Sequence, residues 1–274
     1  MTSNIDDVSK TQIVIFCGGK GTRLGEVTEG LTPKPMVRIA GLPILLHIMN
    51  SYAKQGFMRF VLCVGHKSWQ IKEFFLNYEY FGANCRIHNG DVEILDTVGP
   101  ININNWEILI IETGENTHTA GRLHIASEYI DQDLFMLTYG DGVSDVNYDE
   151  LVNFHLSHDK LLTITGVPSP GRFGELRVLE NGLAIGFEEK PKNVGNLING
   201  GFMCVDREFI DKYIPNSAEN IMFEDEPLRN AVENGDLMVF QHTGFWQCMD
   251  TPRDYQFLTE LFRSGKFNGQ SKKI

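Results

Sequence analysis

Apolar and polar positions alternate along the first half of the chain in blocks typical of strands and helices. The apolar run at 13–16 is continuous, which is typical of a strand buried on both faces. Similar runs, each predicting another strand, lie at 60–65, 107–114 and 134–142. Helices are predicted between them, over 45–53, over 68–77 and from Thr119 onward. This alternation predicts an α/β fold with a doubly wound, mainly parallel sheet.

The second half of the chain has a different pattern, in which short strand-like runs are separated by Gly, Pro and Asn. These runs lie at 161–167, 174–179, 183–189 and 200–206. They predict an antiparallel β extension packed onto the first sheet. Helices are predicted again over 224–234 and 252–264. Because no repeat or interdomain linker interrupts the chain, we expect a flexible leader at 1–11 and a single domain at 12–274.

Composition narrows the class of protein. Of 274 residues, 42% are hydrophobic and 22% are charged, which is typical of a soluble globular protein. Acidic residues outnumber basic ones by 36 to 24, and the net charge of −12 disfavours nucleic acid and anionic membranes as partners. No apolar run approaches the ~20 residues that cross a bilayer, and the first ten residues lack a signal-peptide pattern. The five cysteines form no C-x-x-C motif, so we expect reduced thiols that pack as apolar residues in a cytoplasmic protein.

A glycine-rich segment follows the first predicted strand and reads FCGGKGTR from Phe16 to Arg23. It lacks the Walker pattern, and Leu24 occupies the third glycine position of the dinucleotide pattern G-x-G-x-x-G. What remains is a glycine loop that carries its own arginine. Glycines expose consecutive backbone N–H groups, which can surround a phosphate chain, and the planar guanidinium of Arg23 matches two phosphate oxygens.

Lys34 lies between Pro33 and Pro35, which hold its backbone extended and limit the positions that its ammonium group can reach. Together with the glycine loop, this restricted cation favours a phosphate-binding interpretation. The alternative is a tight turn followed by solvated basic side chains.

The stretch CGGKGTRLGEVTEGLTPKPMV resembles the N-terminal motif of the sugar-1-phosphate nucleotidylyltransferases. Further stretches resemble, in order and spacing, the glucose-1-phosphate cytidylyltransferases of that family: TAGRL, YGDGVSD, PGRFGEL, EEKPK, INGGFM and GFWQCMDTPRD. The resemblance runs from about Gln12 to Gly265. It implies a Rossmann-like nucleotidyltransferase fold, Mg²⁺ as the cofactor and a homo-oligomer.

Two aspartates are candidate metal ligands. Asp141 follows a predicted strand at the carboxyl edge of the sheet, where a carboxylate can hold Mg²⁺ together with substrate phosphates, although YGDG can also be a simple turn. The resemblance implies Asp250 as the second ligand, and the alternative is a cap for the helix that begins near Pro252. We interpret Asp145 as a solvated loop residue. The histidines lack zinc-binding spacing, so His118 and His124 are interpreted as ordinary surface or core residues.

Thr119 is expected to cap the following helix, which places Arg122 in the first turn, where a cation is unfavourable unless an anion is near. The resemblance implies that Arg122 binds nucleotide, and the alternative is a surface arginine paired with Glu128. Ala120 stands where the family usually has a glycine, so its methyl group could reduce the space that the family has beside the backbone at this position. The implied nucleotide-binding residues are Phe16, Cys17, Gly18, Gly19, Lys20, Gly21, Thr22, Arg23, Thr117, Arg122 and Gly140. The implied catalytic groups are Arg23, Lys34 and Asp141.

The resemblance also implies a sugar-phosphate site made of Arg172, Glu189, Lys190, Asn199, Gly200 and Trp246. An adjacent acid and base suit a sugar phosphate, because a carboxylate accepts hydroxyl hydrogens and an ammonium meets the phosphate. The alternatives are a solvated strand end at Glu189 and Lys190, a turn braced by Arg172, and a buried aromatic at Trp246.

The activity implied by the resemblance is transfer of CMP from CTP to α-D-glucose 1-phosphate, which gives CDP-glucose and pyrophosphate. Because the sugar phosphate is already an anion, the reaction needs positioning and charge neutralisation more than a general base. Two other interpretations remain open. One is the same reaction with another nucleotide or sugar phosphate, and the other is a non-catalytic regulatory subunit that binds nucleotide sugars.

Overall fold

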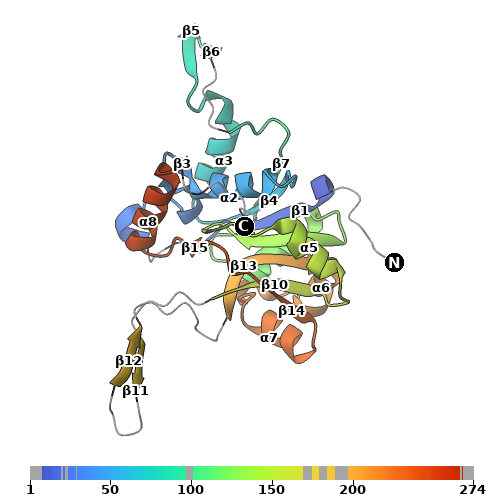
Figure 1. Cartoon of the computed structure of the whole chain (residues 1–274). Helices are drawn as coiled ribbons and strands as arrows, with labels where there is room; N and C mark the ends of the chain where they lie inside the picture. Colours follow the sequence, from blue (N-terminus) through green and yellow to red (C-terminus); the bar gives the residue numbers. More distant parts are fainter. Residues whose placement is uncertain are drawn as a thin grey trace.

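The computed structural model describes residues 8–19, 21, 24–28, 30–96, 101–168, 175–178, 184–188, 197–265 and 267. Its centre is a seven-stranded sheet with the order β14-β10-β13-β8-β1-β4-β7 (Figure 1). These strands are β1 (Gln12–Phe16), β4 (Arg59–Val64), β7 (Glu107–Glu112), β8 (Leu134–Tyr139), β10 (Leu162–Pro168), β13 (Leu197–Asp206) and β14 (Leu237–Gln241). The four strands predicted in the first half of the chain are therefore confirmed.

The sheet is mainly parallel, as predicted. β1 runs parallel to β4 and β8, and β4 runs parallel to β7. β13 is antiparallel to both of its neighbours, β8 and β10, with Phe202 opposite Thr138. The strands of the second half thus extend the sheet by hydrogen bonding beside it, and β11 (Glu175–Val178) and β12 (Ala184–Glu188) form a separate pair.

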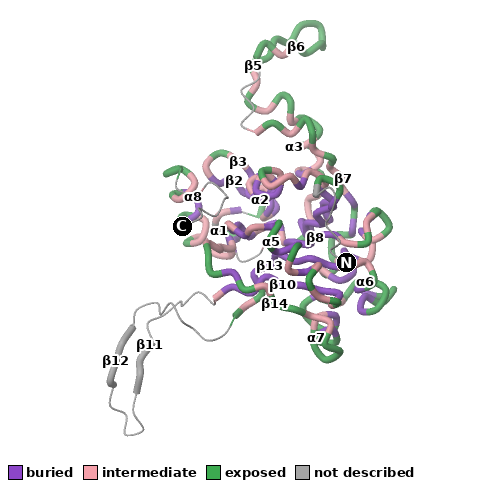
Figure 2. The backbone as a smooth tube through the Cα atoms, turned by 45° about the vertical axis from the view of Figure 1, so that its right-hand side comes forward, coloured by how far each residue is buried: buried purple, intermediate pink, exposed green. Residues whose placement is uncertain are grey.

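Helices cover both faces of the sheet because alternate residues of its buried strands point to opposite sides. Ile13 and Ile15 belong to one core cluster, and Val14 and Phe16 belong to the other. The first cluster packs α2 (Ile44–Ala53), α3 (Ser68–Leu76), α5 (Tyr148–Leu156) and α8 (Pro252–Arg263). The second packs α4 (Thr119–Ala126), α6 (Arg207–Tyr213) and α7 (Glu226–Glu233). Figure 2 shows the buried sheet between exposed helical surfaces.

Short elements complete the described chain. They are η1 (Val8–Lys10), α1 (Gly25–Thr28), η3 (Lys34–Met36), β2 (Arg38–Ile39), β3 (Leu42–Pro43), η4 (Tyr78–Tyr80), η5 (Ser127–Tyr129), β9 (Gly142–Ser144), η6 (Ala218–Asn220) and β15 (Trp246–Cys248). The predicted leader at 1–11 falls mostly outside the described residues, and within it the Lys10 carbonyl accepts a hydrogen bond of 2.9 Å from Arg59.

A hairpin of β5 (Asn84–His88) and β6 (Asp91–Asp96) projects beyond α3, away from the sheet (Figures 1 and 2). Asn89 and Gly90 form its turn with φ values of 53° and 92°, as expected for an Asn-Gly hairpin. Cys85 is exposed on this hairpin, which corrects the expectation that every thiol packs as an apolar residue. Cys17, Cys63 and Cys204 are buried as predicted, and all five cysteines are free.

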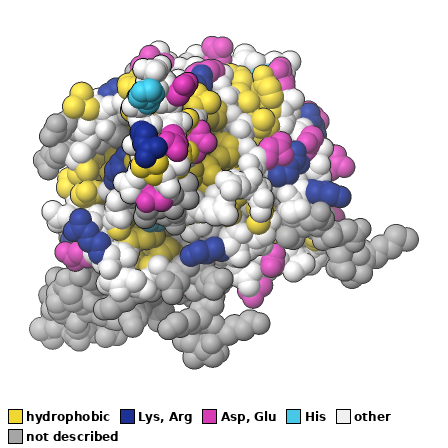
Figure 3. All heavy atoms as spheres, turned by 90° about the horizontal axis from the view of Figure 1, so that it is seen from above, with side chains coloured by type: hydrophobic (Ala, Val, Ile, Leu, Met, Phe, Trp, Pro, Cys, Tyr) yellow, Lys and Arg dark blue, Asp and Glu magenta, His cyan; other side chains and the backbone are white. Residues whose placement is uncertain are grey.

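The surface carries charges of both signs. On the face seen in Figure 3, acidic and basic side chains are interspersed, with hydrophobic patches among them. In the part of the chain that the structure describes, no helix is both long enough and apolar enough to cross a membrane.

Candidate active site

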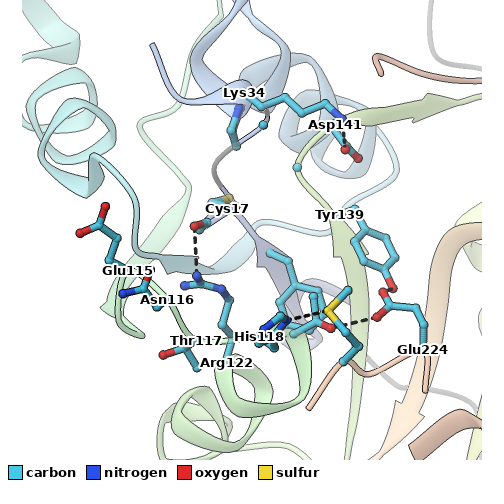
Figure 4. Close-up of a pocket in the computed structure, with 18 of the residues that line it drawn as sticks. Cys17, Lys34, Glu115, Asn116, Thr117, His118, Arg122, Tyr139, Asp141 and Glu224 are labelled. Atoms are coloured by element: carbon cyan, nitrogen blue, oxygen red, sulfur yellow. Dashed lines mark hydrogen bonds and ion pairs between the residues drawn. The ribbon is translucent and has the colours of Figure 1, made fainter. Parts of the chain in front are cut away.

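A cavity of about 760 Å³ opens at the carboxyl ends of β1, β7 and β8 (Figure 4). This is the edge at which parallel α/β sheets bind ligands, because the loops that follow neighbouring strands meet there. The glycine loop after β1, the segment 115–119 after β7 and the segment 139–141 at the end of β8 line the cavity. A fourth segment, 220–224, closes it from the far half of the chain.

The glycine loop leaves β1 in a fixed direction. The N–H of Cys17 donates to the carbonyl of Cys63 across 2.9 Å, and the Gly18 carbonyl accepts a hydrogen bond of 3.3 Å from the N–H of His66. Gly21 has a φ of 59°, a left-handed conformation that favours glycine. The loop therefore turns sharply at the cavity wall, while Lys20, Thr22 and Arg23 lie outside the described residues.

Arg122 supports this loop from below. It lies in the first turn of α4 and is only 3% exposed. Its guanidinium donates to the carbonyls of Gly18 and Val64 at 3.0 and 3.2 Å, and to Oγ1 of Thr113 at 2.6 Å. Burial lowers the pKa of Arg122, but an arginine remains charged at neutral pH. The alternative of a surface arginine paired with Glu128 is wrong.

The absence of a side chain at Gly18 leaves room for that guanidinium. A Cβ atom at Gly18 would lie 2.0 Å from Nη1 of Arg122, whereas a Cβ atom at Gly19 meets no described atom within 4 Å. The two neighbouring glycines therefore have different roles: the first admits the arginine, and the second leaves the cavity open.

The start of α4 forms the opposite wall of the cavity, beside the segment 218–224. His118 and Ala120 donate their backbone N–H groups to the carbonyls of Glu219 and Ile221. The expectation that Thr119 caps α4 is wrong, because His118 occupies the cap position and Thr119 Oγ1 accepts the N–H of Phe223. Ala120 is fully buried, so its methyl group is accommodated, and the tight position is Gly121, where a Cβ atom would lie 2.7 Å from Thr117.

Lys34 joins the two candidate metal ligands. Its Nζ lies 2.6 Å from Oδ2 of Asp141 and 2.5 Å from Oδ1 of Asp250, and its side chain is 13% exposed. Burial opposes the charge of Lys34, but the two carboxylates outweigh burial and raise the pKa of the ammonium above its usual value. The cap for α8 is Thr251, which accepts the N–H of Asp254, so the alternative of Asp250 as the helix cap is wrong.

This cluster fits a divalent cation. The two carboxylates and one ammonium carry a net charge of −1, and both carboxylates accept a hydrogen bond from Nζ of Lys34, which lines the cavity. Mg²⁺ is often held by one or two protein carboxylates and completes its coordination with water and substrate phosphates. The described residues contain no group of three or more metal-binding side chains, so such an ion would depend on the substrate for its remaining ligands.

The described residues that were predicted to bind the sugar phosphate lie on β13, which pairs with β8, and on β15, which pairs with β9. Trp246 Nε1 donates to the carbonyl of Gly200 at 2.7 Å, and Asn199 Oδ1 accepts the N–H of Gly201 at 2.8 Å. A Cβ atom at Gly201 would lie 2.8 Å from the ring of Tyr139, so this part of β13 packs directly on the last residue of β8. Trp246 is half-buried, and Arg172, Glu189 and Lys190 lie outside the described residues.

Comparison with known proteins agrees with this geometry. The sequence profile described as Nucleotidyl transferase matches residues 12–260. The chain belongs to the nucleotidyl transferase family. The resemblance stated from its motifs is therefore confirmed, and so is the predicted fold class.

Within the nucleotidyl transferase family, this chain is similar to glucose-1-phosphate cytidylyltransferase of Salmonella typhi, with 42% identity over 92% of this chain and 96% of that protein. The probable glucose-1-phosphate cytidylyltransferase of Bacillus subtilis is 40% identical, with the same coverage. Among solved structures, HddC from Yersinia pseudotuberculosis matches with a TM-score of 0.66 and 25% identity, over 92% of this chain and 99% of that one. HddC has also been solved in complex with GMP-PN.

The structure of this nucleotidyl transferase brings most of the described candidate residues to one cavity. The wall includes Phe16, Cys17, Gly18, Gly19, Gly21, Lys34, Thr117, Arg122, Gly140 and Asp141. Asp250 does not line the cavity but pairs with Lys34, and Asn199, Gly200 and Trp246 are not among its lining residues either. Their roles in binding remain predictions.

Several residues of the cavity wall were not predicted from the sequence. They include Glu115, Asn116, Tyr139, Asn220, Met222 and Glu224, and also His118, which was interpreted as an ordinary residue. Tyr139 directly precedes Gly140 and Asp141, so its position in the sequence could have indicated that it lies at the site. The segment 220–224 carries no motif that could have done so. Asp145 corrects another expectation: it is not a solvated loop residue, because its carboxylate accepts the N–H of Phe245 at 2.7 Å and lies 3.0 Å from His242.

Proposed function

We propose that this enzyme transfers CMP from CTP to α-D-glucose 1-phosphate, giving CDP-glucose and pyrophosphate. The observation that carries the choice of substrates is the 42% identity with glucose-1-phosphate cytidylyltransferase of Salmonella typhi, over nearly the whole of both chains. The geometry of the site supports the reaction class, because a glycine loop, the partly buried ammonium of Lys34 and the carboxylate of Asp141 line one cavity, and Asp250 pairs with the same ammonium.

In this reaction, a phosphate oxygen of glucose 1-phosphate attacks the α-phosphorus of CTP and forms a new P–O bond. The bond from the α-phosphorus to the bridging oxygen breaks, and its electron pair leaves with pyrophosphate. The attacking oxygen is already an anion, so no side chain has to remove a proton. The protein's task is to hold two polyanions in line and to neutralise the charge that develops.

The residues of the cavity suit that task. Gly18, Gly19 and Gly21 line the cavity, where their backbone N–H groups would bind the triphosphate, and Arg122 fixes the loop through the Gly18 carbonyl. Lys34 stays protonated at neutral pH, because its pKa is raised, and it supplies positive charge near Asp141. Lys20 and Arg23 remain predicted phosphate ligands outside the described residues.

Asp141 and Asp250 are the proposed Mg²⁺ ligands. When bound there, Mg²⁺ would neutralise phosphate charge and polarise the phosphoryl group. The other residues proposed for the sugar phosphate are Arg172, Glu189, Lys190, Asn199, Gly200 and Trp246. A homo-oligomer and a cytoplasmic location are further proposals from the resemblance, and sedimentation equilibrium tests the first.

Pyrophosphate release tests the proposed function directly. CTP, UTP, dTTP, ATP and GTP are each paired with glucose, galactose and mannose 1-phosphate, with and without Mg²⁺. The proposal expects the highest kcat/KM with CTP and glucose 1-phosphate, and turnover that requires Mg²⁺. Higher turnover with another pair keeps the mechanism and replaces the substrates. Absence of turnover with every pair favours a non-catalytic regulatory subunit.

A matched pair of aspartate variants checks the site in the same assay. Asp141→Asn should lower kcat/KM by more than about 100-fold, because charge stabilisation of the transition state is lost. Asp149→Asn alters an exposed carboxylate in the first turn of α5 and should leave turnover unchanged. Equal activity of both variants would remove Asp141 from the active site.

A further inference from the structure

Glu224 is held in one orientation at the wall of the cavity. Its Oε1 accepts a hydrogen bond from the hydroxyl of Tyr139 (Figure 4), and its Oε2 accepts one of 2.9 Å from Oγ1 of Thr119. The Thr119 hydroxyl is itself fixed, because it accepts the N–H of Phe223 at 2.7 Å. The carboxylate is exposed to the cavity, and each of its oxygens keeps a lone pair for a ligand.

An anchored carboxylate is unexpected in a cavity proposed for two polyanions. Among the described residues, no cationic side chain pairs with Glu224, and no group of three metal-binding side chains includes it. An ionised carboxylate can only accept hydrogen bonds. Its favourable ligand is therefore an O–H or N–H group of a substrate and not a phosphate oxygen.

The order of strands in the sheet indicates which substrate Glu224 faces. The glycine loop follows β1, and Thr117 follows β7, so the residues implied in nucleotide binding lie on one side of β8. Asn199 and Gly200 lie on β13, on the other side of β8. Tyr139 ends β8, packs on Gly201 and donates to Oε1 of Glu224, whereas Thr119, at the start of α4, donates to Oε2, so the carboxylate lies at the end of β8, between α4 and β13.

We propose that Glu224 accepts a hydrogen bond from a ring hydroxyl of the hexose and so selects the sugar 1-phosphate. This inference rests on the proposed function and adds a specificity residue to it. Tyr139 and Thr119 act as positioning residues, because they hold the carboxylate and touch no reacting atom. Tyr139 remains a donor at neutral pH, since burial, together with the carboxylate of Glu224, raises its pKa well above the usual value.

A carboxylate that is positioned to accept a hydrogen bond from a substrate hydroxyl discriminates against a sugar that lacks this hydroxyl, because the bond is then not formed. The test therefore combines Glu224→Ala and Glu224→Gln with glucose 1-phosphate and its 2-, 3-, 4- and 6-deoxy analogues. Both variants should lower kcat/KM for glucose 1-phosphate by about 10- to 100-fold, with the KM for CTP unchanged within twofold. One deoxy analogue should be used equally well by wild type and by both variants.

The matched control is Glu226→Gln, an exposed acid two residues away that does not line the cavity, and it should leave all constants unchanged. Circular dichroism and the thermal midpoint establish that each variant is folded. Isothermal titration of glucose 1-phosphate into wild type and Glu224→Ala, in the presence of the nonhydrolysable CTP analogue, gives a second readout. This titration should show weaker binding of glucose 1-phosphate to Glu224→Ala than to wild type, whether or not the enzyme turns over CTP with glucose 1-phosphate.

Three results would overturn the inference. One is a raised KM for CTP with an unchanged kcat and KM for the sugar phosphate, which would place Glu224 at the cytosine base of CTP. Another is an equal loss with glucose 1-phosphate and with every deoxy analogue, which would make its role purely structural. The third is unchanged binding and turnover in both variants. Failure of wild type to use glucose 1-phosphate with CTP, while Glu224→Ala still weakens sugar-phosphate binding, would instead contradict the proposed function.

Discussion

The guanidinium of Arg122 donates a hydrogen bond to the carbonyl oxygen of Gly18 across 3.0 Å and so fixes the glycine loop to α4. The same guanidinium bonds the carbonyl of Val64 and the hydroxyl of Thr113, which joins the loops after β1, β4 and β7. An arginine that is 3% exposed and bonded to backbone carbonyls positions the loop, and this role accounts for its burial in an otherwise apolar layer.

Replacing Arg122 should therefore misplace the loop. Arg122→Lys keeps the charge but loses the fork that reaches three acceptors, so we expect kcat/KM to fall on the order of 100-fold.

Gly18→Ala places a methyl group against the guanidinium and should lower the free energy of unfolding by about 1–3 kcal/mol. Urea denaturation measures this loss, and Gly19→Ala, which meets no described atom, should show almost none. Equal stabilities of the two alanine variants would contradict the role of Arg122.

Lys34 pairs with both Asp141 and Asp250, and its single positive charge offsets part of their negative charge. Lys34→Met leaves the two carboxylates facing each other, so we expect a loss of about 1–2 kcal/mol in the free energy of unfolding. Because Mg²⁺ can replace the missing positive charge, it should raise the thermal midpoint of Lys34→Met more than that of wild type. Scanning calorimetry with and without Mg²⁺ gives both values. The double variant Lys34→Met/Asp141→Asn should lose most of the extra response, and an equal response in all three proteins would argue against a metal at this place.

Trp246 supports the backbone of the proposed sugar site through its bond to the Gly200 carbonyl. Trp246→Phe keeps an aromatic ring but removes the indole N–H and leaves that carbonyl without this donor. We expect the KM for glucose 1-phosphate to rise about 5- to 10-fold, with little change for CTP. Trp69→Phe makes the same substitution at a residue that is 59% exposed and serves as the control. A change confined to the KM for CTP would contradict the assignment of Trp246 to the sugar side.

A chain of hydrogen bonds between α5 and the sheet makes stability depend on pH. His158 and His155 contact the buried hydroxyl of Thr163 at 2.9 and 2.8 Å, and His155 also contacts Asp206. Burial, with help from the nearby His155, lowers the pKa of His158, so the unfolded chain binds more protons than the folded one. The free energy of unfolding should therefore decrease as the pH falls through about 6.5.

Urea denaturation between pH 5 and pH 8 measures that dependence. His158→Gln should reduce it without abolishing it, because burial lowers the pKa of His47 as well, whereas His88→Gln, which alters an exposed histidine of the β5–β6 hairpin, should leave it unchanged. Identical pH profiles of wild type and His158→Gln would show that this histidine does not control the acid sensitivity.

Much of the fold was readable because its signals are local. The runs that became β1, β4, β7 and β8 are continuous apolar strands that end at glycines or acids, and a parallel sheet places their ends together. That argument located the glycine loop and Asp141 at one edge. The β5–β6 hairpin had an equally local signal in Asn89 and Gly90, which went unrecognised.

The remaining features depend on contacts between distant segments. Glu224 reaches the cavity because the segment before α7 hydrogen-bonds to the start of α4, and nothing near Glu224 in the sequence encodes that pairing. Arg122 could not be recognised as a buried support, because its acceptors, two carbonyls and one hydroxyl, belong to three other segments. The capping of α4 was predicted wrongly for the same reason: Thr119 is used by Phe223 and Glu224 instead of by its own helix.

A crystal structure of the protein with CTP, Mg²⁺ and an unreactive analogue of glucose 1-phosphate tests the central claim most directly. The account predicts the triphosphate against the backbone of the loop at 18–21, with Mg²⁺ bound by Asp141 and Asp250 and the hexose on the β13 side of Tyr139. A nucleotide bound outside this cavity, or a metal ion that touches neither aspartate, would contradict it.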